Sequence, residues 1–227
     1  MRIQPKHAVL LVAIFALAAF SCKTILINQV VKGYAKKAGE SFAGFEVEDT
    51  SGNKIMLDTT AGSVLYIGYW AVWCGPCIGE MPDHNKMAQK LEGKDVTFVN
   101  VCLGTPDEKA KWRQLVREKQ LRGLNYFVDR GEPRVLWAGN EGLPAHLLVG
   151  PGGKVLGSGL APDEGGWVAY ALLRAREGYT VKQSFKAYAK DGVKIDDMKK
   201  SDPDRYFTLL HFDLDSTSAA RLEAQGY

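Results

Sequence analysis

Along residues 42–189, short apolar runs are followed by longer segments with helical spacing, which predicts strands and helices in turn. The segments expected to be strands are 42–47, 54–57, 64–70, 96–103, 125–128, 143–149 and 154–158. The segments expected to be helices are 75–91, 106–120, 133–138, 167–177 and 181–189. Strand 96–103 is a continuous apolar run followed by a helix, as in a parallel sheet covered on both faces. The pattern therefore predicts an α/β fold.

Local signals mark the ends of several of these elements. Residues 49–53 have turn composition and join two strands into an N-terminal hairpin. Thr105 and Glu108 have the spacing of a capping box at the start of a helix. Pro82 lies inside helix 75–91, where it removes one backbone hydrogen bond and predicts a kink.

Residues 1–22 have the composition of a targeting segment. A basic start precedes an uncharged apolar run, residues 8–20, which is too short to span a bilayer comfortably. Cys22 follows a small residue at the end of this segment, which resembles the lipobox at which bacterial lipoproteins are cleaved and lipidated. An uncleaved anchor and an ordinary secretory leader are the alternatives. Each places the body of the protein outside the cytoplasm, and residues 23–39 then form a tether.

Length and charge limit the classes of protein that fit. The 227 residues, 46% of them hydrophobic, are enough to bury one ordinary core with an appendage. The formal net charge is +3, and part of it belongs to the leader, so the remainder is close to neutral. A nearly neutral domain argues against a nucleic-acid partner.

Cys74 and Cys77 carry the chemistry that the pattern indicates. They stand in C-x-x-C spacing between strand 64–70 and helix 75–91, so Cys74 meets the unpaired N–H groups of the first helical turn. Such donors favour the thiolate, which makes Cys74 the expected nucleophile and Cys77 the resolving thiol. A zinc site is the alternative, but no second C-x-x-C supplies the remaining ligands. We therefore expect redox chemistry without a metal or another cofactor.

The stretch Tyr69-Trp70-Ala71-Val72-Trp73-Cys74-Gly75-Pro76-Cys77 resembles the active-site segment of the thioredoxin superfamily. Glu80-Met81-Pro82 and the leader are similar to the membrane-tethered, periplasm-facing thiol-disulfide oxidoreductases of the TlpA and ResA type. The resemblance covers residues 40–178 and implies a thioredoxin-like domain, with a central mixed sheet flanked by helices and an N-terminal hairpin. Residues 179–227 remain as a C-terminal extension of unknown role.

The resemblance also implies how a substrate is held. In this superfamily the proline at the place of Pro144 is cis and lies against the cysteine pair. The backbone of the preceding residue, here Leu143, then pairs with an extended substrate segment. A trans proline at the start of an edge strand is the alternative. Trp73 is expected to contact the partner beside Cys74, whereas Trp70 is expected in the core.

Glu80 lies three residues after Cys77 and therefore on the same face of the helix. Its carboxyl group is a candidate to carry the proton that Cys77 loses or gains during resolution. The alternative is a first-turn carboxylate that the helix dipole stabilises. Many thioredoxins have a buried Asp, and TlpA-like proteins an Asn, where this chain has Gly68. The resemblance therefore places more of the proton transfer on Glu80.

Three other residues have reactive side chains but a simpler interpretation. Cys102 lies in an apolar strand and is expected to be a small buried hydrophobic residue, with a regulatory thiol as the alternative. In an oxidising compartment such an odd thiol has to be buried. We expect His146 to be an ordinary strand residue and His84 to lie on the surface of its helix.

These observations together predict an enzyme that reduces protein disulfides outside the cytoplasm. The Gly75-Pro76 dipeptide resembles that of the reducing members, apocytochrome c is one expected substrate, and the family implies a membrane thiol relay as reductant. A disulfide oxidase or isomerase is the alternative within this class. Outside it, the alternative is a non-catalytic binding module that acts through residues 179–227.

Overall fold

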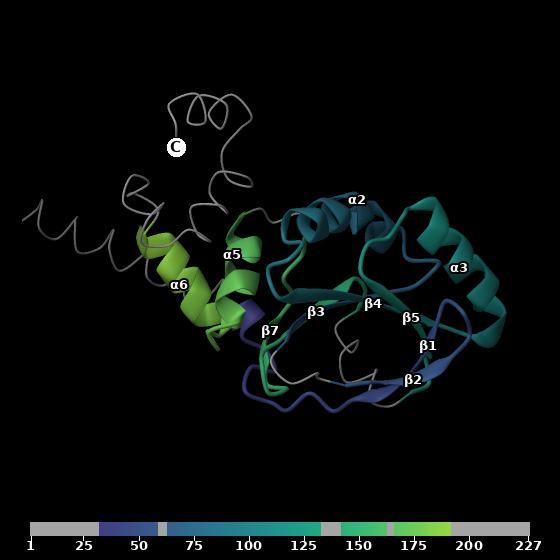
Figure 1. Cartoon of the computed structure of the whole chain (residues 1–227), viewed down its shortest axis with the longest axis horizontal. Helices are drawn as coiled ribbons and strands as arrows, with labels where there is room; N and C mark the ends of the chain where they lie inside the picture. The colour runs from purple at the N-terminus through teal and green to yellow at the C-terminus, as the bar shows by residue number, and fades with distance from the viewer. Residues whose placement is uncertain (1–31, 59–62, 133–141, 163–165, 192–227) are drawn as a thin grey trace, which may run out of the picture.

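The computed structural model of the chain describes residues 32–58, 63–132, 142–162 and 166–191 (Figure 1). The strands are β1 (Phe45–Asp49), β2 (Lys54–Leu57), β3 (Val64–Trp70), β4 (Val96–Gly104), β5 (Leu124–Asp129), β6 (Ala145–Val149) and β7 (Val155–Ser158). The helices are α2 (Gly75–Lys90), the short 3-10 helix η1 (Pro106–Glu108), α3 (Lys109–Glu118), α5 (Gly166–Ala175) and α6 (Val181–Asp191). The elements predicted from the sequence within these residues are confirmed, with ends that differ by a few positions.

The strands of the described residues form one mixed sheet in the order β2-β1-β5-β4-β3-β6-β7. β3, β4 and β5 run parallel at its centre. β1 pairs antiparallel with β5 on one side, and β6 pairs antiparallel with β3 on the other. The predicted mixed sheet is confirmed. Parallel strands end at a common edge, where α/β proteins commonly carry their sites, and the chain leaves β3 there toward Cys74.

The N-terminal hairpin is held at its turn and along α3. The Asp49 carboxylate accepts backbone N–H bonds within the turn, including that of Asn53 at 2.8 Å. Glu48 has a side chain only 14% exposed and accepts from Lys109 and from Arg113, the latter at 2.8 Å. These charge-assisted hydrogen bonds attach the hairpin to α3 and so to the central strands.

Helices cover one face of the sheet, where α2 and α3 lie above β3, β4 and β5 in the view of Figure 1. One core cluster on this face joins α2 and α5 to the strands, and Tyr66 and Met87 are almost fully buried in it. A second cluster, around Trp112 of α3, contains both Cys74 and Cys77. The opposite face carries a third cluster, which the hairpin shares with the inner strands. The cysteine pair is therefore built into the core and not attached to its surface.

Both ends of the described chain pack at β7. The N–H of Gly39 donates to the carbonyl of Val155 at 2.8 Å. The ring of Tyr34 packs edge-on against Trp167 of α5, with 4.8 Å between centroids, and Phe185 of α6 lies 5.2 Å from the same indole. The described part of the expected tether and the first helix of the expected extension thus meet on β7 and α5.

Several predictions fall outside the described residues. These are the leader with Cys22, helix 133–138 and the part of the extension after residue 191. Among the described helices, none combines the length and the hydropathy that crossing a membrane requires.

Candidate active site

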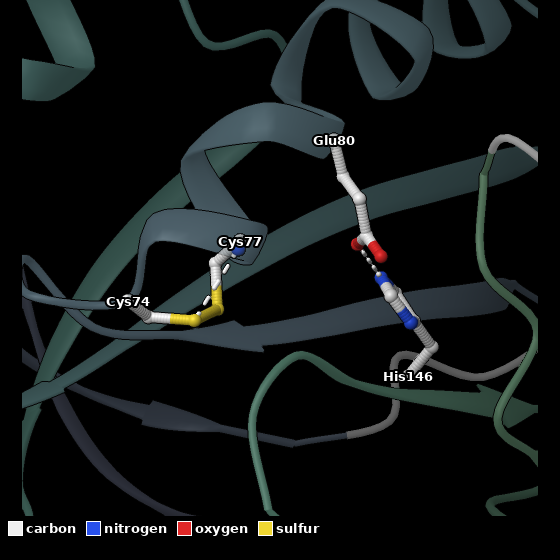
Figure 2. Close-up of a disulfide and its surroundings, with 4 residues drawn as sticks. All are labelled: Cys74, Cys77, Glu80 and His146. Carbon is white, nitrogen blue, oxygen red and sulfur yellow. Dashed lines mark hydrogen bonds and ion pairs between the residues drawn. A yellow bond between two sulfur atoms is a disulfide. The ribbon is translucent and has the colours of Figure 1, made fainter.

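The segment after β3 places two cysteines at the first turn of α2. Cys74 is the N-cap residue of the helix, and Cys77 follows within its first turn. Their Sγ atoms are joined in a disulfide, and each residue is 4% exposed (Figure 2). The helix continues across Pro82 without a break. The two thiols singled out in the sequence therefore lie within bonding distance at a helix start.

The backbone around Cys74 favours negative charge on its sulfur. The N–H of Cys77 donates to Sγ of Cys74 at 3.3 Å, so the sulfur itself caps the helix. The positive end of the helix dipole adds to the potential at the same place. When the disulfide is reduced, these groups stabilise the thiolate, which is the form that attacks disulfides.

The two tryptophans beside the cysteines lie in different environments. Trp73 is 60% exposed, and Trp70 is 5% exposed and in the core, as predicted for it. The Arg130 guanidinium lies 6.0 Å from the Trp73 ring centroid and is paired with Glu108 at 2.6 Å. Trp73 therefore presents a large apolar surface next to Cys74.

The chain that leads into β6 brings two more residues to the site. The Leu143–Pro144 peptide bond is cis, as the resemblance implied. Leu143 is half-buried and packs against the cluster that contains Cys74 and Cys77. Pro144 lines the same pocket as Cys77. Both residues are thus beside the disulfide.

Glu80 of α2 faces His146 of β6 in the pocket that Cys77 also lines. Oε2 of Glu80 lies 3.4 Å from Nε2 of His146, and Figure 2 shows the two side chains pointing toward each other. The side chain of His146 is 8% exposed and that of Glu80 is 21% exposed. Cys77 lines the same pocket, so Glu80, His146 and Cys77 share one cavity. The prediction that His146 is a strand residue is confirmed, but its contact with Glu80 was not foreseen.

Both histidines of this region are neutral at pH 7. The ring of Tyr66 stacks with His146 at 5.6 Å and with His84 at 6.3 Å between centroids. Burial, followed by the proximity of His84, lowers the pKa of His146 to about 3. Burial also lowers the pKa of His84, although the Arg122 carbonyl lies 3.0 Å from its Nε2. The pocket therefore holds two uncharged imidazoles.

The prediction that His84 lies on the helix surface is wrong. The residue is 5% exposed and belongs to the buried face of α2, together with Cys77. Seven residues are close to two turns of an α-helix, so position 84 repeats the face of position 77. The helical periodicity therefore carried the correct signal.

Gly68 leaves room for the imidazole of His146. The two residues are paired across β3 and β6, and a Cβ at position 68 would lie 3.7 Å from Cδ2 of His146. The cavity beside them has a volume of about 30 Å³, which suits a single water molecule. Asn100 of β4 also lines this cavity and donates to the Arg122 carbonyl at 2.8 Å. The polar groups of the pocket thus come from α2, β4 and β6.

Cys102 is a free cysteine in the same core cluster as Cys74 and Cys77. It is fully buried, and burial raises the pKa of its thiol well above the ordinary value. The prediction of a small buried hydrophobic residue is confirmed. In the part of the chain that the structure describes, no group of three or more His, Cys, Asp or Glu residues is arranged to hold a metal ion.

Sequence comparison finds relatives named as thiol-disulfide oxidoreductase ResA. The protein of Bacillus thuringiensis subsp. konkukian (strain 97-27) is 29% identical over 133 residues, which cover 59% of this chain and 75% of the relative. The protein of Geobacillus kaustophilus (strain HTA426) is 30% identical over 161 residues, which cover 68% of this chain and 84% of the relative.

Structural comparison agrees with the predicted fold. The thioredoxin domain of a thiol-disulfide oxidoreductase from Bacteroides vulgatus matches with a TM-score of 0.51 and 20% identity, over 63% of this chain and 97% of that domain. At this identity the likeness concerns the fold, and the thioredoxin-like arrangement is confirmed. The sequence profile of the AhpC/TSA family matches residues 38–157.

Proposed function

Because the chain belongs to the AhpC/TSA family and is a thiol-disulfide oxidoreductase like its relatives, we propose a direction and a mechanism for its chemistry. It reduces disulfides of protein substrates outside the cytoplasm, with Cys74 as the nucleophile and Cys77 as the resolving thiol. One observation carries the role of Cys74 as the nucleophile, whereas the direction rests on the resemblance of Gly75-Pro76 to the reducing members. The sulfur of Cys74 caps α2 and accepts the N–H of Cys77 at 3.3 Å, an environment that stabilises a thiolate.

The reaction consists of two thiol–disulfide exchanges. The Cys74 thiolate attacks one sulfur of the substrate disulfide, forms a mixed disulfide and releases the first substrate thiolate. The deprotonated sulfur of Cys77 then attacks Sγ of Cys74, which releases the second thiolate and forms the disulfide seen in Figure 2. Two electrons pass to the substrate, and its two thiolates take up protons. A membrane thiol relay returns the pair to the dithiol.

Trp73, Leu143 and Pro144 form the surface against which the substrate lies. Trp73 offers an indole that is 60% exposed, and Leu143 and Pro144 are half-buried beside the cysteines. An extended segment that pairs with the backbone at Leu143 is held by main-chain hydrogen bonds, which most sequences provide. Specificity is therefore broad, and apocytochrome c is one substrate of this kind.

The leader supports a membrane-attached location. In this proposal the signal segment is cleaved before Cys22, which is lipidated, and residues 23–39 connect it to the thioredoxin-like domain, residues 40–178. Labelling with a radioactive fatty acid tests this in cells that express the wild type or Cys22→Ser. Label on the wild type and none on the variant is the expected result, whereas equal labelling of both contradicts lipidation at Cys22.

Alkylation and turnover test the roles of the cysteines. We expect iodoacetamide at mildly acidic pH to label Cys74 of the reduced protein first, because Cys77 and Cys102 lack the N-cap position. Cys74→Ser abolishes insulin reduction, and Cys77→Ser accumulates a mixed disulfide with the substrate. Cys102→Ala is the matched control and keeps activity. Labelling of Cys77 or Cys102 before Cys74 would overturn the assignment.

The reduction potential decides the direction of electron flow. A value near that of thioredoxin, about −270 mV, supports a reductase, whereas a value near about −120 mV is typical of the strongest oxidants of the superfamily. We expect the former. The potential is measured by equilibrating the full-length protein with glutathione or dithiothreitol buffers and quantifying the disulfide.

A further inference from the structure

We propose that His146 is a positioning residue that holds the carboxyl group of Glu80 in the pocket that Cys77 also lines, so that Glu80 takes the proton of the resolving thiol. The inference rests on the proposed function, because it concerns the second of the two exchanges. His146 acts through Glu80 and not on sulfur. The proposal thus gives the buried imidazole of His146 an indirect role in proton transfer.

In the contact between His146 and Glu80, the imidazole is held in place and the carboxyl group can move. His146 is fixed because it lies on a strand inside the sheet, paired with Gly68, and its ring lies 8° from parallel to that of Tyr66. Glu80 reaches the imidazole from α2 through a longer side chain with more rotatable bonds, and the Oε2–Nε2 distance is 3.4 Å. The imidazole therefore limits the positions of the carboxyl group to one side of the pocket that Cys77 lines.

A neutral imidazole suits a carboxyl group that changes its protonation state. The Nε2–H tautomer donates to the Glu80 carboxylate and, after proton transfer, to the carbonyl oxygen of the Glu80 carboxylic acid. One contact thus persists before and after proton transfer. A lysine or arginine at the same place would favour the carboxylate alone and would oppose its protonation.

Other groups near the pair have separate partners or no charge. His84, from α2, contacts the Arg122 carbonyl through Nε2 at 3.0 Å. The hydroxyl of Tyr66, from β3, donates to the Leu160 carbonyl at 2.6 Å. The amide of Asn100, from β4, and the buried phenol of Tyr69 are uncharged at neutral pH. Among the described residues that line the pocket, Glu80 alone has a carboxyl group.

The proton and the electrons balance within the exchange itself. The S–H of Cys77 gives its proton to Glu80, and the resulting thiolate forms a bond to Sγ of Cys74. The bond between Cys74 and the substrate sulfur breaks, and the substrate leaves as a thiolate. Glu80 then gives its proton to that thiolate or to solvent and returns to the carboxylate. No further oxidant or reductant is needed.

Two amide variants test the contact with matched chemistry. In His146→Gln the amide nitrogen reaches about as far as Nε2 of histidine, whereas in His146→Asn the side chain is one methylene shorter and falls short of Glu80. The reduced full-length proteins are mixed with 5,5′-dithiobis(2-nitrobenzoic acid) and followed at the absorbance of the released thionitrobenzoate. The first release reports attack by Cys74, and the second reports resolution by Cys77.

We expect His146→Asn to slow the second release about tenfold, the rate equivalent of one lost hydrogen bond, and to leave the first release within about twofold. His146→Gln restores the second release to within about threefold of the wild type, since its amide still donates. In a Glu80→Gln background, His146→Asn has no further effect. Equal slowing by the Asn and Gln variants, or undiminished slowing in the Glu80→Gln background, refutes a positioning role.

If the His146 variants fold poorly, Glu80→Gln still tests the proposal. Glu80→Gln leaves His146 and the sheet intact, and it has to slow the second release and change its pH dependence; an unchanged second release in that variant overturns the proposal. Failure of the proposed function has a different signature, because the wild type would then release neither thionitrobenzoate in a Cys74-dependent manner.

Discussion

Gly68 and His146 lie opposite each other on β3 and β6, where a Cβ at position 68 would come within 3.7 Å of Cδ2 of the imidazole. Cross-strand neighbours at such spacing limit each other's size. One strand lacks a side chain here, and the other fills the space with a ring that meets Glu80 at 3.4 Å. The contact between His146 and Glu80 therefore depends on the absence of a side chain at Gly68.

The first prediction concerns the size of residue 68. Gly68→Ala keeps the fold, because its methyl group lies at ordinary contact distance from His146. Gly68→Val adds two methyl groups against the imidazole and lowers the free energy of unfolding by about 1–3 kcal/mol. Urea unfolding of both variants measures this difference. Equal stability of the Ala and Val variants would show that the imidazole moves freely.

The second prediction concerns the exposed indole. Trp73→Ala raises the KM for a protein disulfide about tenfold, since an aromatic residue at the centre of an interface commonly contributes more than 1 kcal/mol. The same variant reacts with 5,5′-dithiobis(2-nitrobenzoic acid) at the wild-type rate. Its free energy of unfolding equals that of the wild type, because the side chain is 60% exposed. A proportional loss toward both substrates would assign Trp73 to the chemistry instead of to docking.

The third prediction is a loss of stability in mild acid. Burial lowers the pKa of His146 to about 3 and also lowers that of His84, so the native state holds fewer protons than the unfolded chain below about pH 6.5. Stability is therefore complete above the unfolded pKa and falls as pH decreases, by up to about 1.4 kcal/mol per pH unit for each histidine. Urea titrations between about pH 7 and pH 5 measure this slope.

His146→Gln provides the control for this slope. It removes one of the two titrating rings, so we expect a smaller slope than in the wild type. Asp49 and Glu108 do not interfere in this range, because hydrogen bonds from Asn53 and from the Thr105 backbone, respectively, lower the pKa of each carboxyl. An unchanged slope in the variant would mean that His146 is protonated in the native state.

The fourth prediction concerns the place where the ends of the described chain meet. A Cβ at Gly157 would lie 2.3 Å from Cγ2 of Val181 and 2.6 Å from the carbonyl oxygen of Tyr34. Gly157→Ala must displace α6 or the backbone at Tyr34, and we expect it to lower the free energy of unfolding by about 1–3 kcal/mol. Limited proteolysis then cuts α6 earlier than in the wild type.

Gly79→Ala is the matched control for that substitution. Gly79 is exposed on α2, and a Cβ there meets nothing within 4 Å. Helix propensity alone predicts a gain of up to about 1 kcal/mol. If both variants lost the same stability, the loss would come from alanine in general and not from the contact at β7.

The fold and the cysteine pair were predictable because their signals are local. Strand 64–70 was predicted with the bounds that β3 has, and the turn chemistry of residues 49–53 fixed the hairpin. The N-cap position of Cys74 follows from two neighbouring elements, a strand that ends and a helix that begins. The cis bond before Pro144 needed the resemblance, since most single prolines are trans.

The contact between Glu80 and His146 was not predicted, because it joins elements that are distant in the sequence. It depends on the register of β6 against β3 and on the position of α2 over the sheet, and neither is encoded locally. Part of it was available: residues 144 and 146 share a face of their strand, so a proline expected near the cysteines placed His146 there as well. The same argument from periodicity would have corrected His84.

The meeting of both ends of the described chain at β7 also has a mechanical consequence. The N–H of Gly39 is hydrogen-bonded to Val155 of β7, and α6 packs on the same strand (Figure 1). A force that pulls residue 32 away from residue 191 therefore enters and leaves the fold at neighbouring points. The load is borne by β7 and α5. The parallel strands and the first turn of α2 lie outside this load path, so the sulfur pair keeps its geometry while either end is under tension.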